Sequence, residues 1–318
     1  MKPLTLATTA CLAAVAISDQ AFAWGDEGHE AVALIAKHYL TADAQAALTQ
    51  LLGPTDPSVP ADIASRATWA DKYRASSPAR YTATHNWHFV DLEIDGTPDM
   101  SSACFGHLHI AVSGPASASW PDDCVVDKIE QFRAELTSTA TSPAERQLAL
   151  QFLLHFVGDV HQPLHSADHH DAGGNAVYVV WGKRKTPSPL HSFWDDQAVS
   201  GNATTASAFA SKALAAMTQT RCTALATGAD QAGSSESWAN DAYALAKSVA
   251  YGMLPKAYAG SATISTKSGP KTVQYYKLSA TYVAKAKSTA FDQISAAGVR
   301  LAAVLNRVLA NEATSCSV

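Results

Sequence analysis

Apolar residues recur at helical spacing along most of this sequence, and that periodicity limits the folds the chain can adopt. In the segment 29–40, Ala31, Val32 and Ile35 fall on one face of a helix. The same spacing recurs in the segments 125–136, 144–160, 207–218, 235–253 and 278–310. Helices with one apolar face bury it against one another. The sequence therefore predicts an all-α fold, a single multi-helix domain over residues 24–318.

Strand-like alternation is rare by comparison. It is clear only in 175–181, which is followed by Gly182 and Lys183, so we expect at most a short β-hairpin near 175–184. Pro, Gly and Ser gather at 53–60, 112–122 and 186–189, and 259–270 is also loop-like. None of these segments is long enough for a domain linker, so long loops within the one domain are expected.

The N-terminus has the pattern of a secretory signal peptide. Lys2 precedes a short apolar run at 10–17, and a small–x–small triplet follows at 21–23. The run is too short to span a bilayer. A buried N-terminal helix is the alternative. We expect residues 1–23 to be removed, so that a secreted or periplasmic protein begins at Trp24.

The cysteines left after this cleavage are Cys104, Cys124, Cys222 and Cys316. In an exported chain they predict two disulfides, for which three connectivities are possible. Pairing Cys104 with Cys124 and Cys222 with Cys316 is favoured because the first pair flanks one loop. Free buried thiols are the alternative.

The net charge of −5 argues against a protein that holds nucleic acid by a basic surface alone. If the substrate is a polyanion, the positive field has to be local. Bound metal ions would supply such a field.

Histidines are unevenly distributed and interleaved with aspartates. Most lie in 85–109 and 155–191, and none follows His191. His155 and Asp159 are four residues apart, so on a helix they share one face. Pro163 then ends that helix and lets His165 turn toward the same region. Imidazole and carboxylate together are typical zinc ligands.

A second pair, His191 and Asp195, repeats the four-residue spacing. A surface pair is the alternative for either pair, but the neighbours Phe156, Val157, Phe193 and Trp194 are too apolar for an exposed face. Three upstream residues are further candidates, each weak by itself: His29, Asp71 and His88.

The new N-terminus can also bind metal. A free α-amino group and the first carbonyl oxygen, both from Trp24, can chelate one ion if the amine is unprotonated. With three protein ligands for each catalytic zinc, nine ligand residues suit three zinc ions. These are Trp24, His29, Asp71, His88, His155, Asp159, His165, His191 and Asp195.

In these residues the chain resembles the zinc-dependent single-strand nucleases of the S-one/P-one type, which share the phospholipase C/nuclease fold. The matching segments run in order over nearly the whole mature chain: 24–29, 69–74, 88–91, 155–165, 173–175, 191–195 and 297–302. The resemblance implies that one zinc takes Asp71, His88 and His155, and a close second takes Trp24 and His29. Asp159 would bridge these two ions, and His165, His191 and Asp195 would hold a third.

The resemblance also implies substrate contacts and a reaction. Phe89 would stack on a base, Asp91 would accept from the base edge, and Arg74 would contact phosphate. Asp71 and Asp159 would act in catalysis as ligands. Hydroxide generated at the zinc ions would attack phosphorus in line, cleaving single-stranded DNA and RNA to 5′-nucleotides, with 3′-nucleotidase activity besides. We expect a monomer without a membrane partner.

Some residues have no place in this pattern. The loop 99–123, with His107 and His109, does not align with the family, and its role, including any part in shaping the substrate cleft, is left open. Other histidines of the segments 85–109 and 155–191 also lack a ligand role, His161 being the best candidate to support a ligand from outside the metal site. They are His85, His161, His169 and His170. Asn202 begins a glycosylation sequon, a triplet that often occurs by chance.

Two alternatives remain open at this point. A zinc-dependent phospholipase C shares the three zinc ions and the tryptophan terminus, but there the first histidine lies further from the terminus and the last pair ends in glutamate. The short gap from Trp24 to His29 and the final Asp195 favour the nuclease. A protein that only sequesters zinc would not need Phe89 or Arg74.

Overall fold

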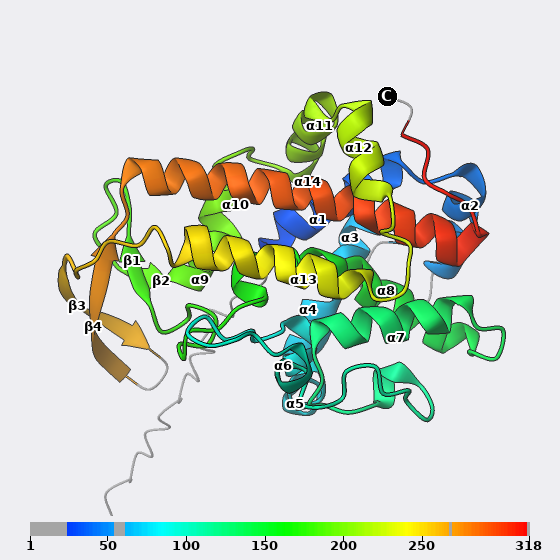
Figure 1. Cartoon of the computed structure of the whole chain (residues 1–318), viewed down its shortest axis with the longest axis horizontal. Coiled ribbons are helices and arrows are strands. Elements are labelled where there is room, and N and C mark those ends of the chain that lie inside the picture. The colour runs from blue at the N-terminus through cyan, green and yellow to red at the C-terminus, as the bar shows by residue number, and fades with distance from the viewer. Residues whose placement is uncertain (1–23, 54–60, 267–268, 317–318) are drawn as a thin grey trace, which may run out of the picture.

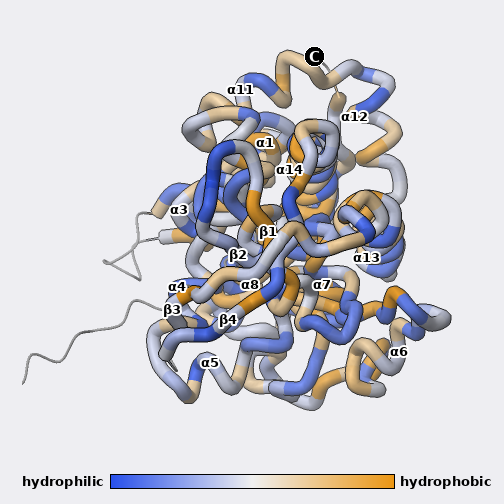
Figure 2. Tube along the Cα trace, turned by 90° about the vertical axis from the view of Figure 1, so that its left-hand side faces the viewer, coloured by the Kyte–Doolittle hydropathy of each residue, from blue (hydrophilic) through white to orange (hydrophobic). Residues whose placement is uncertain are grey.

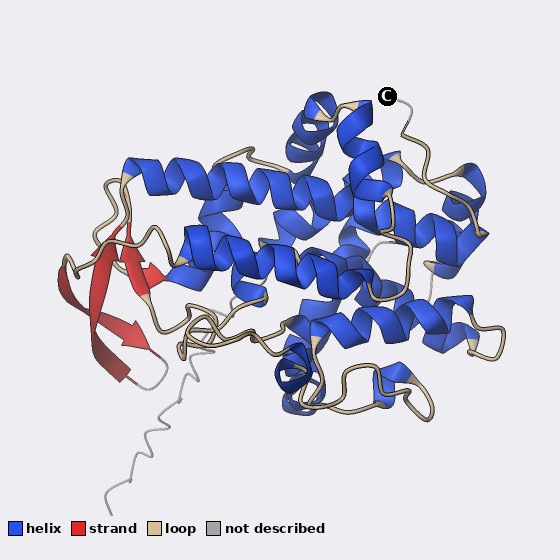
Figure 3. Ribbon diagram, in the orientation of Figure 1, coloured by secondary structure: helices blue, strands red, loops and turns tan. Residues whose placement is uncertain are grey.

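The computed structural model describes residues 24–53, 61–266 and 269–316. The expected signal segment 1–23 lies outside these residues, so its cleavage stays a prediction. The described chain is mainly helical, as the periodicity predicted (Figure 3). Among the described residues, no helix is both long and apolar enough to cross a membrane.

The helices account for every segment that showed helical periodicity. The α-helices are α1 (Gly25–His38), α2 (Ala42–Leu51), α3 (Ile63–Ala67), α4 (Trp69–Ala75), α5 (Pro78–Thr84), α6 (Met100–Ala103), α7 (Val125–Thr137), α8 (Pro143–Asp159), α9 (Leu190–Ser192), α10 (Ala198–Ser200), α11 (Ala206–Ala216), α12 (Gln219–Ala226), α13 (Ser234–Leu245) and α14 (Ala280–Ala310). Short 3₁₀ turns are η1 (His85–His88), η2 (Ala116–Ala118) and η3 (Pro163–His165), and π turns are η4 (Phe193–Gln197) and η5 (Ala246–Ala250).

Helices α1 and α14 pack closely in the core of the molecule (Figure 1). Ser279 caps the start of α14 by accepting from the Tyr282 amide, and the helix ends at Asn311, whose φ of 57° is left-handed. A Cβ added at Gly298 would lie 2.5 Å from Cβ of Ile35, so glycine is what lets the two backbones approach. This close contact fixes α1, the helix that carries His29.

Helix α8 is buried along most of its length and packs on α7. Its ring contacts include Phe152 stacked on Phe132, with centroids 5.0 Å apart. Figure 2 shows hydrophobic stretches at β1 and near α8, and the apolar residues Val179, Phe152 and Phe156 of these elements are buried. A helix apolar on all sides belongs in a core, and α8 thereby places His155 and Asp159 at the centre of the protein.

The β-structure is larger than expected. Strands β1 (Tyr178–Val180), β2 (Ser188–Pro189), β3 (Gly260–Thr266) and β4 (Gly269–Lys277) form a sheet in the order β2-β1-β4-β3. Tyr178 pairs with Pro189, so the first hairpin closes beyond the predicted 175–184. Of the segment 259–270, which was interpreted as a loop, residues 260–266 form β3 and residues 269–270 begin β4. Ala262 and Ile264 alternate with polar residues there, a strand signal that the surrounding Gly and Ser obscured.

Both disulfides are present, Cys104 to Cys124 and Cys222 to Cys316, which is the favoured pairing. The side-chain amide of Asn202 donates to the carbonyl oxygens of Ala198 and Lys287, at 2.9 and 2.8 Å. A glycan would leave that nitrogen with one N–H, so at least one of these hydrogen bonds would be lost, and the structure disfavours glycosylation of the sequon.

Candidate metal centre and substrate pocket

Eight of the predicted ligand side chains converge in the interior, and all are buried. They form groups whose ligand atoms lie within 4.8 Å of one another. We call His29, Asp71, His88, His155 and Asp159 the helix cluster, and His165, His191 and Asp195 the loop cluster.

Asp159 is the centre of the helix cluster. Its Oδ2 lies 3.0 Å from Nδ1 of His88 and 3.3 Å from Nε2 of His155. Its other oxygen, Oδ1, faces Nε2 of His29 at 3.3 Å. Asp71 completes the group, with its Oδ2 3.6 Å from Nε2 of His155. Because the two oxygens of Asp159 face different histidines, its carboxylate can bridge two ions.

The imidazole of His155 is held in one tautomer. Its Nδ1 donates to the carbonyl of Ala67 at 2.7 Å, so Nε2 carries no proton, and its lone pair faces the carboxylates and is free to bind a cation. His29 stacks on His155, with ring centroids 3.8 Å apart. A Cβ at Gly158 would lie 2.8 Å from Nδ1 of His29, so a glycine in α8 makes room for the stacked ring.

The loop cluster is oriented by backbone carbonyls. Nδ1 of His165 donates to the His88 carbonyl at 2.8 Å, and Nδ1 of His191 donates to the Gly173 carbonyl at 2.6 Å. Both Nε2 atoms therefore present lone pairs, and they lie 3.0 Å apart. Asp195 places Oδ2 3.5 Å from Nε2 of His191. Two facing lone pairs beside a carboxylate repel one another unless a cation lies between them.

Burial shifts the pKa of these groups toward their uncharged forms. It raises the pKa of Asp71 to about 7 and that of Asp159 well above its usual range. It lowers the pKa of His155 well below its usual range and that of His191 to about 4. A divalent cation favours ionised carboxylates and neutral imidazoles together.

Buried polar atoms without a hydrogen-bond partner also indicate metal-binding sites. Nε2 of His155 and Oδ2 of Asp195 are buried without a hydrogen-bond partner among the described residues. Buried polar atoms are normally paired, and a missing ion is one reason for an exception. The donor set of imidazole nitrogen and carboxylate oxygen is the set that zinc takes. The residues present therefore fit metal ions at both clusters.

Trp24 contacts Gly158, the neighbour of Asp159 in the helix cluster, and Asp195 of the loop cluster. Its indole is fully buried and donates to the carbonyl of Gly158 at 2.8 Å. Its backbone N–H donates to Asp195, and its carbonyl accepts from the Gly28 amide at 3.1 Å. The residue is thus held beside the ligands, while coordination by a freed amine stays a prediction.

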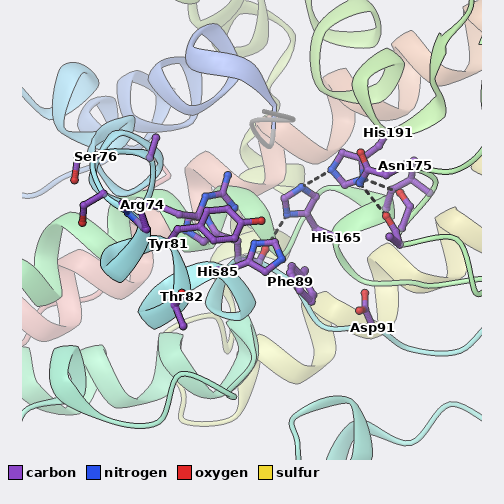
Figure 4. Close-up of a pocket in the computed structure, with 17 residues that line it drawn as sticks. Arg74, Ser76, Tyr81, Thr82, His85, Phe89, Asp91, His165, Asn175 and His191 are labelled. Atoms are coloured by element: carbon purple, nitrogen blue, oxygen red, sulfur yellow. Dashed lines mark hydrogen bonds between the residues drawn. The ribbon is translucent and has the colours of Figure 1, made fainter. Parts of the chain in front are cut away.

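A cavity of about 780 Å³ opens onto the clusters at His88, His165 and His191 (Figure 4). Arg74, Phe89 and Asp91, the three predicted substrate contacts, all line it, together with Ser76, Ser77, Pro78, Tyr81, Thr82, His85, Leu164, Ala172, Gly173 and Asn175 among others. Arg74 is buried, and its Nη2 forms an ion pair with Oδ1 of Asp71 at 2.7 Å. Desolvation raises the pKa of Asp91 to about 7, and the negative charges of Asp168 and Glu93 add to this.

The chain is similar to known nucleases. A family model described as S1/P1 Nuclease matches residues 24–310. Nuclease PA3 of Penicillium sp is 29% identical over 301 residues, which cover 91% of this chain and 99% of that protein. Nuclease P1 of Penicillium citrinum is 32% identical over 54% of this chain and 57% of that protein. Endonuclease 4 of Arabidopsis thaliana is 33% identical over 56% of each chain.

The chain belongs to the S1/P1 nuclease family. It is therefore a hydrolase of phosphodiester bonds that acts on nucleic acid, and its histidine–aspartate clusters are groups suited to hold metal ions. The first relative is covered almost completely, whereas the chain spans little more than half the length of the other two.

One polar residue of this S1/P1 nuclease had no predicted role but contacts a ligand directly. The side-chain amide of Gln162 donates to Oδ1 of Asp195 at 2.8 Å and accepts from the Leu164 amide at 2.6 Å. It thereby ties Asp195 to the turn that carries His165. Its place between His161 and Pro163 was visible in the sequence, but no spacing rule pairs it with a carboxylate 33 residues away.

The histidines outside the predicted ligand set occupy several environments. His161 is buried, donates to the Val157 carbonyl at 2.7 Å and accepts from Arg300 at 2.8 Å, so it contacts backbone and arginine rather than a ligand side chain. His107 stacks on Trp120, and the cavity lining contains no residue of the loop 99–123. Of the others, His109 lies beside Glu236, His169 beside Asp95 and His170 beside Glu93, while His85 lines the pocket and the His38 ring meets Tyr39 edge-on.

Proposed function

We propose that this protein is an exported zinc-dependent endonuclease that cleaves single-stranded DNA and RNA to 5′-nucleotides and also removes phosphate from 3′-nucleotides. The observation that carries the proposal is the convergence of two buried histidine–aspartate clusters on one cavity lined by Arg74, Phe89 and Asp91. The two clusters together would form the metal centre, and the cavity lined by Arg74, Phe89 and Asp91 would bind a base and a phosphate.

Three zinc ions suit the ligands. Asp71, His88 and His155 would hold one, and the backbone of Trp24 with His29 a second. Asp159 would bridge them, because its two oxygens face different histidines. The loop cluster would hold the third. When bound, the ions supply Lewis-acid chemistry, activating water near neutral pH and balancing the charge of the phosphate.

The remaining residues bind and orient the substrate. Arg74 brings a permanent positive charge to the cavity, anchored by its ion pair with Asp71, and suits a phosphate oxygen. Phe89 offers a ring on which a base can stack, and Asp91 beside it can accept from base N–H groups. Stacking on a side chain needs a base that is free of its neighbours, which favours single strands.

Export fits the two disulfides, because such bonds persist in oxidising compartments. Removal of residues 1–23 would free the amine of Trp24, so that processing completes the metal site outside the cytoplasm. The protein would then act as a monomer. A version that keeps the segment 1–23 should lack one zinc of the close pair and be nearly inactive.

One assay tests the proposal. The purified mature protein is incubated with single-stranded DNA, RNA, 3′-AMP and phosphatidylcholine, with and without a chelator, and its zinc content is measured. We expect chelator-sensitive hydrolysis of the first three. Hydrolysis of the lipid alone would indicate a phospholipase C. Zinc binding without any hydrolysis would indicate sequestration.

A further inference from the structure

Three aromatic rings follow one another along one wall of the cavity. Tyr81 in α5, His85 in η1 and Phe89 are spaced four residues apart, and all three line the cavity. The Tyr81 and His85 rings are stacked, with centroids 4.6 Å apart and planes 18° apart. His85 meets Phe89 edge-on at 5.5 Å. In Figure 4 the rings run in this order from the Arg74 side of the cavity toward Asp91.

Tyr81 is placed to receive a flat ligand. His85 covers one face of its ring, yet the residue is 40% exposed, one of the few large apolar residues at the surface. It lines the same cavity as Phe89. An exposed tyrosine backed by a stacked imidazole is a rigid platform, and every base has a π-face that can stack on it.

Charge indicates how a strand would run along this wall. Around Asp91 lie Glu93, Asp168 and Asp171, which act on it electrostatically. The segment 76–88 at the other end contains no acidic residue. Arg80 lies there, with its guanidinium 4.4 Å from the Tyr73 ring centroid and its Nη1 2.9 Å from Oγ of Ser76. Phosphates of a polyanion are repelled from the acidic end and attracted toward the basic one.

We propose that Tyr81, held by His85, is a second base-stacking platform, so that the cavity binds two successive nucleotides of a single strand. One base would occupy the Phe89 and Asp91 end, and the strand would continue past Arg74 onto Tyr81. This inference rests on the proposed nuclease function and deepens it. It makes Tyr81 a determinant of preference for oligonucleotides over mononucleotides.

The test compares kcat/KM of the zinc-loaded enzyme for a short single-stranded oligonucleotide and for 3′-AMP. Replacing a stacking aromatic typically weakens binding about five- to hundredfold per base. Tyr81→Ala should lower the oligonucleotide-to-3′-AMP ratio by that factor, chiefly through KM. Tyr81→Leu, which keeps apolar bulk without a flat ring, should lower the ratio as much as Tyr81→Ala does. Tyr81→Trp should keep the ratio of the wild type.

Tyr258→Ala is the matched control. Tyr258 is 51% exposed and stacks on Tyr276 with centroids 4.5 Å apart, but it does not line the cavity. Its replacement should leave the ratio as in the wild type. An unchanged ratio in Tyr81→Ala and Tyr81→Leu would overturn the proposal, as would an equal fall in Tyr258→Ala.

A binding measurement separates this proposal from the nuclease function. If the wild type hydrolyses neither substrate, the proposed function fails. Whether Tyr81 is a second stacking platform is then decided by the affinity of the zinc-loaded protein for a labelled phosphorothioate oligonucleotide. Weaker binding by Tyr81→Ala than by Tyr258→Ala would support it. Equal affinities, or no binding by the wild type, would refute it.

Discussion

The helix cluster and the loop cluster contain the same kinds of ligand but rest on different supports. In the helix cluster, His29, Asp71 and His155 project from α-helices that pack in the core. In the loop cluster, His165 lies on a 3₁₀ turn and Asp195 on a π turn. Helices fix a ligand by packing along their length, whereas short turns depend on individual hydrogen bonds.

The two clusters are also connected. His88 offers its side chain to Asp159 in the helix cluster, while its backbone carbonyl accepts from Nδ1 of His165 in the loop cluster. The loop cluster thus depends on His88 of the helix cluster. The helix cluster depends less on the loop cluster, whose other supports, Gly173 and Gln162, hold only loop-cluster ligands. Damage to the loop cluster should therefore stay local, whereas damage to the helix cluster should abolish activity.

The largest effect is expected for Asp159→Asn. An amide cannot supply the negative charge that a bridging carboxylate gives to two ions. We expect activity on single-stranded DNA to fall more than about a hundredfold, beyond the ten- to hundredfold typical of changes outside the ligand set. Zinc content should fall to the loop-cluster ion alone, as measured by elemental analysis.

Asp292→Asn is a suitable control, since Asp292 is an exposed partner of Arg221 far from the ligands in sequence. It should keep full activity and zinc. Three zinc ions in purified Asp159→Asn would contradict the bridging role.

A smaller effect is expected for Gln162→Ala, which removes the amide that orients Asp195. Loss of such a support typically costs ten- to hundredfold in metal affinity, about 1.4–2.7 kcal/mol. After dialysis the variant should retain two zinc ions, and excess zinc should restore its activity.

Gln151→Ala separates this effect from general destabilisation. Gln151 is also buried and accepts from Arg66 at 2.8 Å, and no hydrogen bond joins its side chain to a ligand among the described residues. It should lower thermal stability while keeping all its zinc. If Gln162→Ala loses every ion at once, the clusters are not independent.

Sequence spacing predicted the ligands better than their supports. His155 and Asp159 follow from a four-residue spacing on a regular helix. The stacking of His29 on His155 joins residues from separate helices, and no local pattern encodes it. Gln162 was missed because a single amide carries no periodic signal. The β3–β4 hairpin was missed because its strands are mostly exposed and begin among Gly and Ser residues.

The smallest expected effect is a dependence of KM on pH. It distinguishes two carboxylates, Asp71 and Asp91, whose pKa is raised to about 7. Bound zinc would keep Asp71 ionised, because a dication favours the charged form. Asp91 lies among other acids and is not a predicted ligand, so it should still titrate near pH 7. Only its ionised form, present above that pH, accepts hydrogen bonds through both oxygens.

In the zinc-loaded enzyme, KM for an oligonucleotide should therefore rise as pH falls from 8 to 6. The change is about tenfold at most, which is the fall in the ionised fraction of a group with a pKa near 7. Asp91→Asn should have a KM that varies little over this range, because its amide does not titrate. A KM profile in Asp91→Asn as steep as that of the wild type would assign the titration to another group, and the metal ligands would then be the first candidates.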